Sequence, residues 1–67
     1  MTDTKRLQQT VNAAGLPAEF IAERLGITPE AYKRKAAGVK EFMAQEIQTM
    51  RSILALSAED TLTIFFS

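Results

Sequence analysis

The chain has 67 residues, no cysteine and no histidine, and its eight Lys and Arg residues balance its eight Asp and Glu residues. A chain of this length forms one domain at most, and it buries only about 60% of the surface that its unfolded form exposes. Because no disulfide or thiolate metal site can support so small a core, we expect a single domain over residues 1–67, held by helix packing or by association with a second copy.

Residues 3–14 carry one narrow apolar stripe and predict a first helix that ends at Gly15. The stripe consists of Leu7, Val11 and Ala14. Pro17 is a good first residue for a second helix, over residues 17–25, because its missing N–H would have no partner there anyway. Gly26 is expected to end this helix in a left-handed conformation.

Three start signals in consecutive residues predict a third helix, over residues 28–37. Thr28 can cap the helix with its hydroxyl, Pro29 suits the first helical position, and Glu30 favours the positive end of the helix dipole. Gly38 closes the helix. Two short helices joined by a tight turn that contains glycine are typical of a helix-turn-helix motif.

Two further helices are predicted in the last third of the chain. A fourth helix of about three turns follows Phe42, where apolar residues again recur at spacings of three and four. Its start lacks a capping side chain, since Met43 offers no good acceptor. Ser57 can cap a fifth helix. Residues 61–66 alternate Thr, Ile and Phe in a way that also suits a strand, so a short carboxy-terminal strand is the alternative.

The neutral total charge hides an uneven distribution. Residues 24–40 hold five cations against one glutamate, a balance of +4. Residues 41–67 hold one cation against four carboxylates (−3), and residues 1–23 hold two against three (−1). The five cations of the middle segment are Arg24, Lys33, Arg34, Lys35 and Lys40. A local basic surface of this kind is typical of proteins that bind nucleic acid.

Two series of residues occur in a fixed order and spacing. The first runs Ile21-Ala22, Leu25-Gly26-Ile27-Thr28, Tyr32, Arg34-Lys35, Gly38 and Glu41-Phe42, and the second runs Glu46-Ile47, Met50, Ile53-Leu54, Leu56-Ser57, Glu59 and Ile64-Phe65-Phe66. Together they resemble the Cro/C1-type (XRE-family) helix-turn-helix regulators, and the second series resembles small phage proteins of that family. The resemblance covers roughly residues 3–66.

The resemblance implies a five-helix, all-α, lambda-repressor-like domain that binds palindromic operator DNA as a homodimer. Residues 17–25 and 28–37 would be its two motif helices. The sequence departs from the family at Ala18, where members commonly have a Gln that contacts a phosphate, and at Ala37, where they commonly have an Asn that also serves the DNA backbone.

One face of the third helix carries the candidate DNA contacts. Glu30, Lys33, Arg34 and Ala37 fall at i, i+3, i+4 and i+7 and share this face, opposite Tyr32 and Ala36. In the major groove, Arg34 can bind guanine O6 and N7, Glu30 can accept from cytosine N4, and Lys33 can reach guanine or phosphate. The predicted base contacts are Pro29, Glu30, Lys33 and Arg34, and the predicted DNA backbone contacts are Thr28, Lys35, Ala37 and Lys40. The alternative is a solvated face on which Glu30 pairs with Arg34.

The last helix is the candidate dimer interface. Its apolar residues would expose more apolar surface than a chain end normally does. They are Leu62, Ile64, Phe65 and Phe66. A second hypothesis is that the helix-turn-helix module binds a regulatory protein instead, as an antirepressor or an antitoxin-like partner. The acidic flanks and the losses at Ala18 and Ala37 favour this second hypothesis.

Nothing in the sequence indicates catalysis, a metal site or a cofactor. Glu19 and Glu23 lie one turn apart but have no evident second partner, and no spacing matches a metal-binding motif. We therefore expect a protein that is not an enzyme. The longest apolar run, Ile53–Leu56, is too short to cross a membrane, and the first residues lack the apolar core of a signal peptide. These features predict a cytoplasmic protein with no membrane partner.

Overall fold

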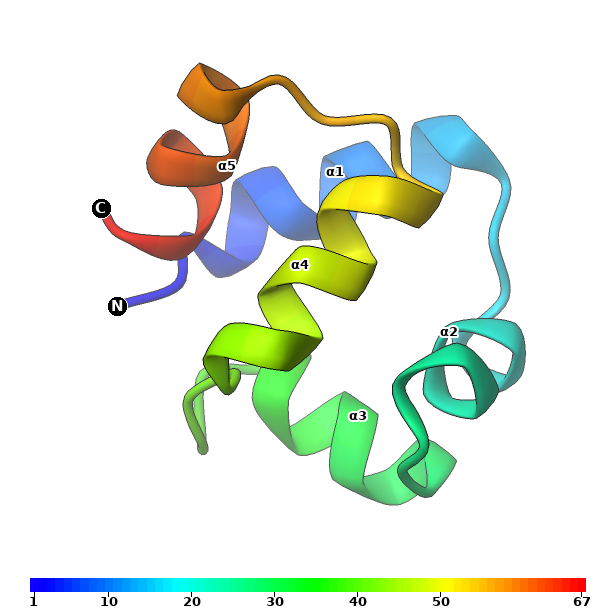
Figure 1. Ribbon diagram of the computed structural model, residues 1–67. Coiled ribbons are helices and arrows are strands. Elements are labelled where there is room, and N and C mark those ends of the chain that lie inside the picture. Colours follow the sequence, from blue (N-terminus) through cyan, green and yellow to red (C-terminus); the bar gives the residue numbers. More distant parts are fainter.

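Five α-helices and no strand make up the computed structural model, which describes all 67 residues (Figure 1). The helices are α1 (Thr4–Ala14), α2 (Ala18–Leu25), α3 (Pro29–Ala36), α4 (Ala44–Ile53) and α5 (Ala58–Phe65). The expected all-α fold with five helices is confirmed. None of the five helices has the length and apolar character that crossing a membrane requires.

The strand alternative for residues 61–66 is wrong, because this segment belongs to α5. Ser57 begins the helix as predicted: its hydroxyl oxygen accepts a hydrogen bond from the Asp60 N–H at 3.0 Å. A side chain that satisfies a free N–H in the first turn stabilises a helix start by about 1 kcal/mol. The Thr61 hydroxyl also bonds inside the helix, to the Ser57 carbonyl at 2.8 Å. The Ser57 cap and the burial of Ile64 and Phe65 against the core outweigh the strand preference of alternating Thr, Ile and Phe.

The other helix boundaries follow the predicted signals with small shifts. Gly26 ends α2 with a φ of 75°, the left-handed conformation expected of it. Pro29 is the first residue of α3, as predicted, whereas Pro17 precedes the first residue of α2 instead of forming it. The start of α4 is capped by a residue of its own first turn: the Glu46 Oε1 accepts a hydrogen bond from the Met43 N–H at 2.8 Å.

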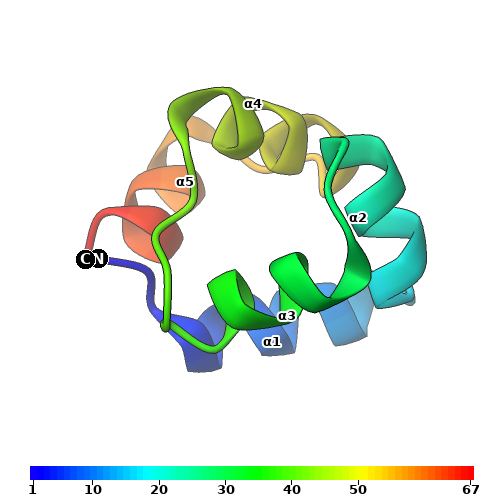
Figure 2. The same ribbon diagram turned by 90° about the horizontal axis from the view of Figure 1, so that it is seen from below.

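The five helices are arranged around a common interior (Figures 1 and 2). Ten buried apolar side chains fill it and form the core. This core consists of Leu7, Val11, Ile21, Ala22, Tyr32, Phe42, Ile47, Met50, Ile64 and Phe65. Phe42 comes from the loop between α3 and α4 and joins two helices. Its ring centroid lies 6.2 Å from that of Tyr32 in α3 and 5.3 Å from that of Phe65 in α5, where the rings meet edge to face. Such aromatic pairs contribute about 0.5–1.5 kcal/mol beyond the area they bury.

The two ends of the chain lie side by side (Figures 1 and 2). The Asp3 N–H donates to the Ile64 carbonyl, and the Ser67 N–H donates to the Met1 carbonyl at 3.1 Å. Thr2, which stands between Met1 and Asp3 in the sequence, is buried. These bonds hold the end of α5 against the start of α1.

Ala55 is the one residue other than glycine with a positive φ, 52°, in the turn that ends α4. The left-handed region costs an L-residue with a Cβ about 1–2 kcal/mol. We therefore predict that Ala55→Gly raises the free energy of unfolding by about 0.5–1 kcal/mol, the net of relieved strain and a more flexible unfolded chain. Chemical denaturation measures the change.

The matched control is Ala13→Gly, the same substitution at an exposed position of α1 with right-handed backbone. This variant should lose up to about 1 kcal/mol, because glycine is a poor helix former. Equal changes in the two variants would show that Ala55 is not strained.

Candidate functional site

The segment from α2 to α3 consists of two short helices joined by a short turn. Both helices are eight residues long, and the three residues Gly26 to Thr28 join them. Three or four residues are the usual length of the turn in a helix-turn-helix motif. The turn is held by local bonds: the Ile27 N–H donates to the Ala22 carbonyl at 3.0 Å, and the Thr28 hydroxyl oxygen accepts from the Ala31 N–H at 3.1 Å. Thr28 therefore caps α3, as predicted.

Buried and exposed side chains of α3 lie on opposite faces of the helix, as the helical period predicts. Tyr32 points inward and is 5% exposed. The opposite face is exposed and carries Glu30, Lys33, Arg34 and Ala37, while Pro29 is partly buried at the first helical position. In Figure 1, α3 forms the lower edge of the molecule. The candidate base-contacting residues therefore share an outward surface, with Pro29 at its border.

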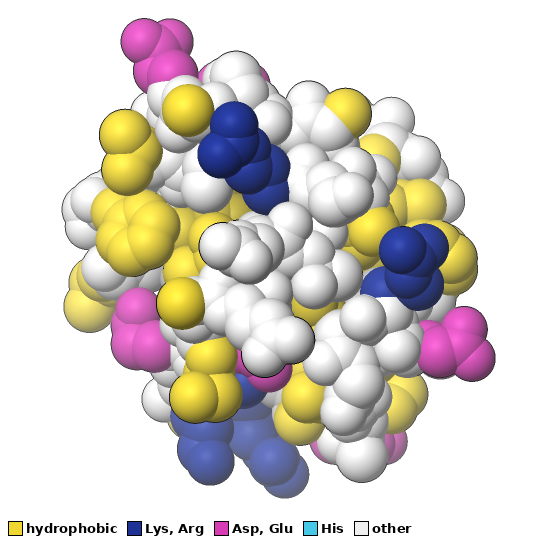
Figure 3. Space-filling model, in the orientation of Figure 1, with side chains coloured by type: hydrophobic (Ala, Val, Ile, Leu, Met, Phe, Trp, Pro, Cys, Tyr) yellow, Lys and Arg dark blue, Asp and Glu magenta, His cyan; other side chains and the backbone are white.

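Three cations near this surface are free of ion pairs. The ion pairs of the structure join the amino terminus to Glu41, Arg6 to Asp3, and Lys35 to Glu46. Lys33, Arg34 and Lys40 take part in none of them and are exposed. No ion pair joins Glu30 to Arg34 either. Lys and Arg side chains project at the lower edge of Figure 3, over α3 and the loop that follows it. These three charges are available to an external anion.

Lys35 is engaged inside the molecule, although it was predicted as a DNA backbone contact. Its Nζ donates to both carboxylate oxygens of Glu46, at 2.6 and 2.7 Å, and the two side chains are only 12% and 11% exposed. Glu46 lies in the first turn of α4. The pair therefore joins α3 to α4 across the loop and withdraws Lys35 from the exposed face.

The Glu46 carboxylate has a lowered pKa. Burial alone raises the pKa of a carboxyl group, but the hydrogen bonds from Lys35 and from the Met43 N–H, with the positive charge of Lys35, outweigh the burial. The ionised carboxylate thus performs two tasks, since it caps α4 and holds Lys35. This contact escaped the sequence analysis because its partners stand eleven residues apart; only the position of Glu46, three residues into α4, hinted at a capping role.

Two of the four candidate dimer residues do not lie at the surface. Ile64 and Phe65 are each 2% exposed and belong to the core of their own chain. Leu62 in α5 and Phe66, the residue that follows α5, are each 60% exposed and stand four residues apart. Hydrophobic side chains gather over this part of the molecule, on the left of Figure 3. The apolar surface at the end of the chain is therefore narrower than expected, because α5 turns half of these residues inward.

The two positions that depart from the resembled family carry only methyl groups. Ala18 is the first residue of α2, and no side chain caps that helix start. Ala37 follows the last residue of α3, and its N–H already donates to the Lys33 carbonyl at 3.0 Å. Neither residue offers a side-chain donor to a ligand.

Acidic side chains do not gather into a candidate metal site, since no group of three or more has suitable geometry. No family model, curated protein or solved structure matches the chain.

The pair between Lys35 and Glu46 predicts a pH-dependent stability. Because the pKa of Glu46 is lowered in the folded state, its contribution is complete above the unfolded value of about 4.3. The contribution is lost as the pH falls through the folded pKa. Glu46→Gln should reduce the free energy of unfolding at neutral pH by about 1–3 kcal/mol and flatten its decline in acid. Urea denaturation as a function of pH measures both effects.

Lys35→Met provides the partner variant, and it should also be destabilised at neutral pH because it leaves a nearly buried carboxylate without its cation. The double variant should lose less than the sum of the two single losses. Additive losses would show that the two groups do not interact in solution.

Proposed function

We propose that the protein is a sequence-specific DNA-binding transcriptional regulator of the Cro/C1 helix-turn-helix type, which binds a palindromic operator as a homodimer. The observation that carries this proposal is the exposed face of α3, where Lys33 and Arg34 stand without ion-pair partners next to the three-residue turn from α2. In helix-turn-helix regulators the second helix of such a motif enters the major groove. A regulator of this kind acts on DNA in the cytoplasm.

Base recognition is assigned to the outward side chains of α3. Arg34 presents a planar fork that matches guanine O6 and N7, and Glu30 can accept from the amino group of cytosine. Because no ion pair joins Glu30 to Arg34, both side chains remain available to a base. Lys33 is one position before Arg34 and can reach a guanine or a phosphate. Pro29 offers an apolar contact at the edge of this surface, where its ring is partly buried.

DNA backbone contacts are assigned to Thr28 and Lys40. The Thr28 oxygen accepts from the Ala31 N–H, but its own O–H remains free to donate to a phosphate. Lys40 is exposed in the loop after α3. Lys35 is given the structural role described above and Ala37 has no free donor, so neither is included. Contacts of this class fix the register of a protein on DNA without reading its sequence.

The homodimer is assigned to the outer face of α5. Leu62 and Phe66 present a compact apolar patch there, and the adjoining Met1 is also exposed. In this arrangement each protomer places one α3 in a major groove, with half-sites about 34 Å apart.

We predict that Arg34→Ala relaxes base preference, while Lys40→Ala weakens binding to all sequences about equally. Fluorescence anisotropy with the DNA upstream of the coding region, and with variants of each bound sequence, distinguishes the two effects. If Lys33 and Lys40 of both protomers neutralise phosphates, the log–log salt slope should be about −4.

Arg51→Ala is the matched control, because Arg51 belongs to the carboxyl-terminal part of α4, far from α3 (Figure 1). This variant should bind as tightly and as selectively as the parent protein. A salt slope near zero, or equal losses in the three variants, would contradict the proposed interface.

For the dimer, we predict that Leu62→Ser combined with Phe66→Ser produces a monomer that folds but binds a full operator at least tenfold more weakly. Analytical ultracentrifugation measures the oligomeric state and anisotropy the affinity. Val39→Ser is the control for the oligomeric state, because Val39 is an apolar residue of still greater exposure, 71%, in the loop between α3 and α4. A dimer that survives the double substitution would place the interface elsewhere.

A second candidate function, binding of a regulatory protein, is favoured by one feature of α2. Phe20 is 37% exposed, and the guanidinium of Arg24 lies 5.8 Å from its ring. Exposed aromatic and arginine side chains are the types that dominate protein interfaces. Phe20→Ala distinguishes the two functions, because it would abolish capture of a protein partner and leave an operator complex through α3 intact.

A further inference from the structure

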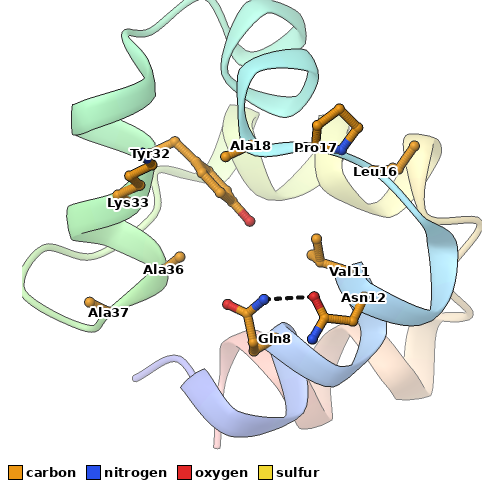
Figure 4. Close-up of a pocket in the computed structure, with 10 residues that line it drawn as sticks. All are labelled: Gln8, Val11, Asn12, Leu16, Pro17, Ala18, Tyr32, Lys33, Ala36 and Ala37. Carbon is orange, nitrogen blue, oxygen red and sulfur yellow. Dashed lines mark hydrogen bonds between the residues drawn. The ribbon is translucent and has the colours of Figure 1, made fainter.

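A groove of about 420 Å³ lies between α1, the start of α2 and α3 (Figure 4). It is open because three of its lining residues, Ala18, Ala36 and Ala37, are alanines. Val11 and Leu16 provide apolar wall. The side chains of Gln8 and Asn12 line the side of α1, where they are joined by a hydrogen bond of 2.9 Å. Grooves of this volume accommodate small organic molecules.

The Tyr32 hydroxyl points into this groove without a partner. Tyr32 as a whole is only 5% exposed. Its hydroxyl end nevertheless projects between Ala18 and Val11 toward the open space (Figure 4). No hydrogen bond joins this oxygen to another atom of the protein, and it is not among the sealed atoms of the core. A phenol on a nearly buried ring is a rigid donor, because the ring is held in place by packing against Phe42.

The groove is also electrostatically suited to an anion. The N–H groups of Ala18, Glu19 and Phe20 at the start of α2 have no acceptor within the protein, and no side chain caps this helix. Such an end carries partial positive charge. Lys33 is among the lining residues and takes part in no ion pair, and no Asp or Glu lines the groove. All its charges therefore have the same sign.

We propose that this groove is a binding site for a small carboxylic acid with an apolar or aromatic body. The carboxylate would accept hydrogen bonds from the Tyr32 hydroxyl, from the Lys33 ammonium and from the free N–H groups of α2. The body would lie against the wall formed by Val11 and Leu16. Inorganic anions lack the apolar part that this wall requires, and cations find no carboxylate there.

Ligand binding would regulate DNA binding, an extension that rests on the function proposed above. Lys33 belongs both to the groove and to the outward face of α3. A carboxylate bound to its ammonium would remove one cation from the DNA surface and place a negative charge beside it. An acid of this class would therefore release the protein from its operator.

The site is tested without DNA, by titrating the ¹⁵N-labelled protein with phenylacetate and recording amide chemical shifts. Phenylacetate should produce saturable shifts confined to α1, the start of α2 and α3, with a Kd of about 1 mM, as expected for a ligand of this size. Phenylacetamide, which lacks the charge, and inorganic phosphate, which lacks the body, should each bind about tenfold more weakly.

Two variants and one matched control locate the ligand. Tyr32→Phe removes only the hydroxyl and should weaken phenylacetate about tenfold. Ala18→Leu should fill the mouth of the groove and abolish binding. Ala44→Leu is the control, because it fills a hollow of similar volume, about 410 Å³, between α2 and α4 and should leave binding unchanged. Thermal denaturation verifies that each variant is folded.

Three results would overturn the proposed site: shifts that do not saturate, phenylacetate binding that survives Ala18→Leu, or equal binding of phosphate. The regulatory extension has its own measurement, the displacement of operator DNA by phenylacetate in fluorescence anisotropy. A protein that binds phenylacetate but not DNA would retain the site and refute only the proposed function.

Discussion

The burial of Phe42 is the constraint on which the arrangement of the helices depends. The core contains only ten apolar side chains, so few contacts decide where each helix lies. Phe42 is contributed by a loop, yet its ring packs against Tyr32 of α3 on one side and against Phe65 of α5 on the other. The loop must therefore return to the core between α3 and α4. This return directs α4 back across the molecule and brings Glu46 within reach of Lys35.

Tyr32 connects this core to both candidate ligand surfaces. The ring fills the inner side of α3, and this fixes the rotation of the helix about its own axis. Because the helical period is 3.6 residues, a buried Tyr32 requires Lys33 and Arg34 to lie toward the outside. The hydroxyl at the far end of the same ring emerges in the groove beside α1 (Figure 4). The two surfaces are thus the outer and lateral sides of one short helix and cannot be placed independently.

Local chemistry made the helices predictable, whereas tertiary contacts were hidden from the sequence. Thr28 and Ser57 act as caps because the required acceptor stands three residues before the N–H that it binds. The division of the last residues was missed for another reason: Phe65 and Phe66 are equally apolar, and only the placement of α5 against the core decides which is buried. The groove beside α1 could not be anticipated, since it forms where residues distant in sequence fail to fill space.

The pair between Lys35 and Glu46 shows how a neutral chain reserves positive charge for one surface. A nearly buried ion pair is weak evidence for stability, because apolar residues of similar size often serve as well. Its geometry is more specific than an apolar contact, since two hydrogen bonds fix both the distance and the direction between α3 and α4. Three consecutive cations on a free helix would spread around more than half of its circumference. With Lys35 bound to α4, the two remaining cations, Lys33 and Arg34, are presented on the same outward side.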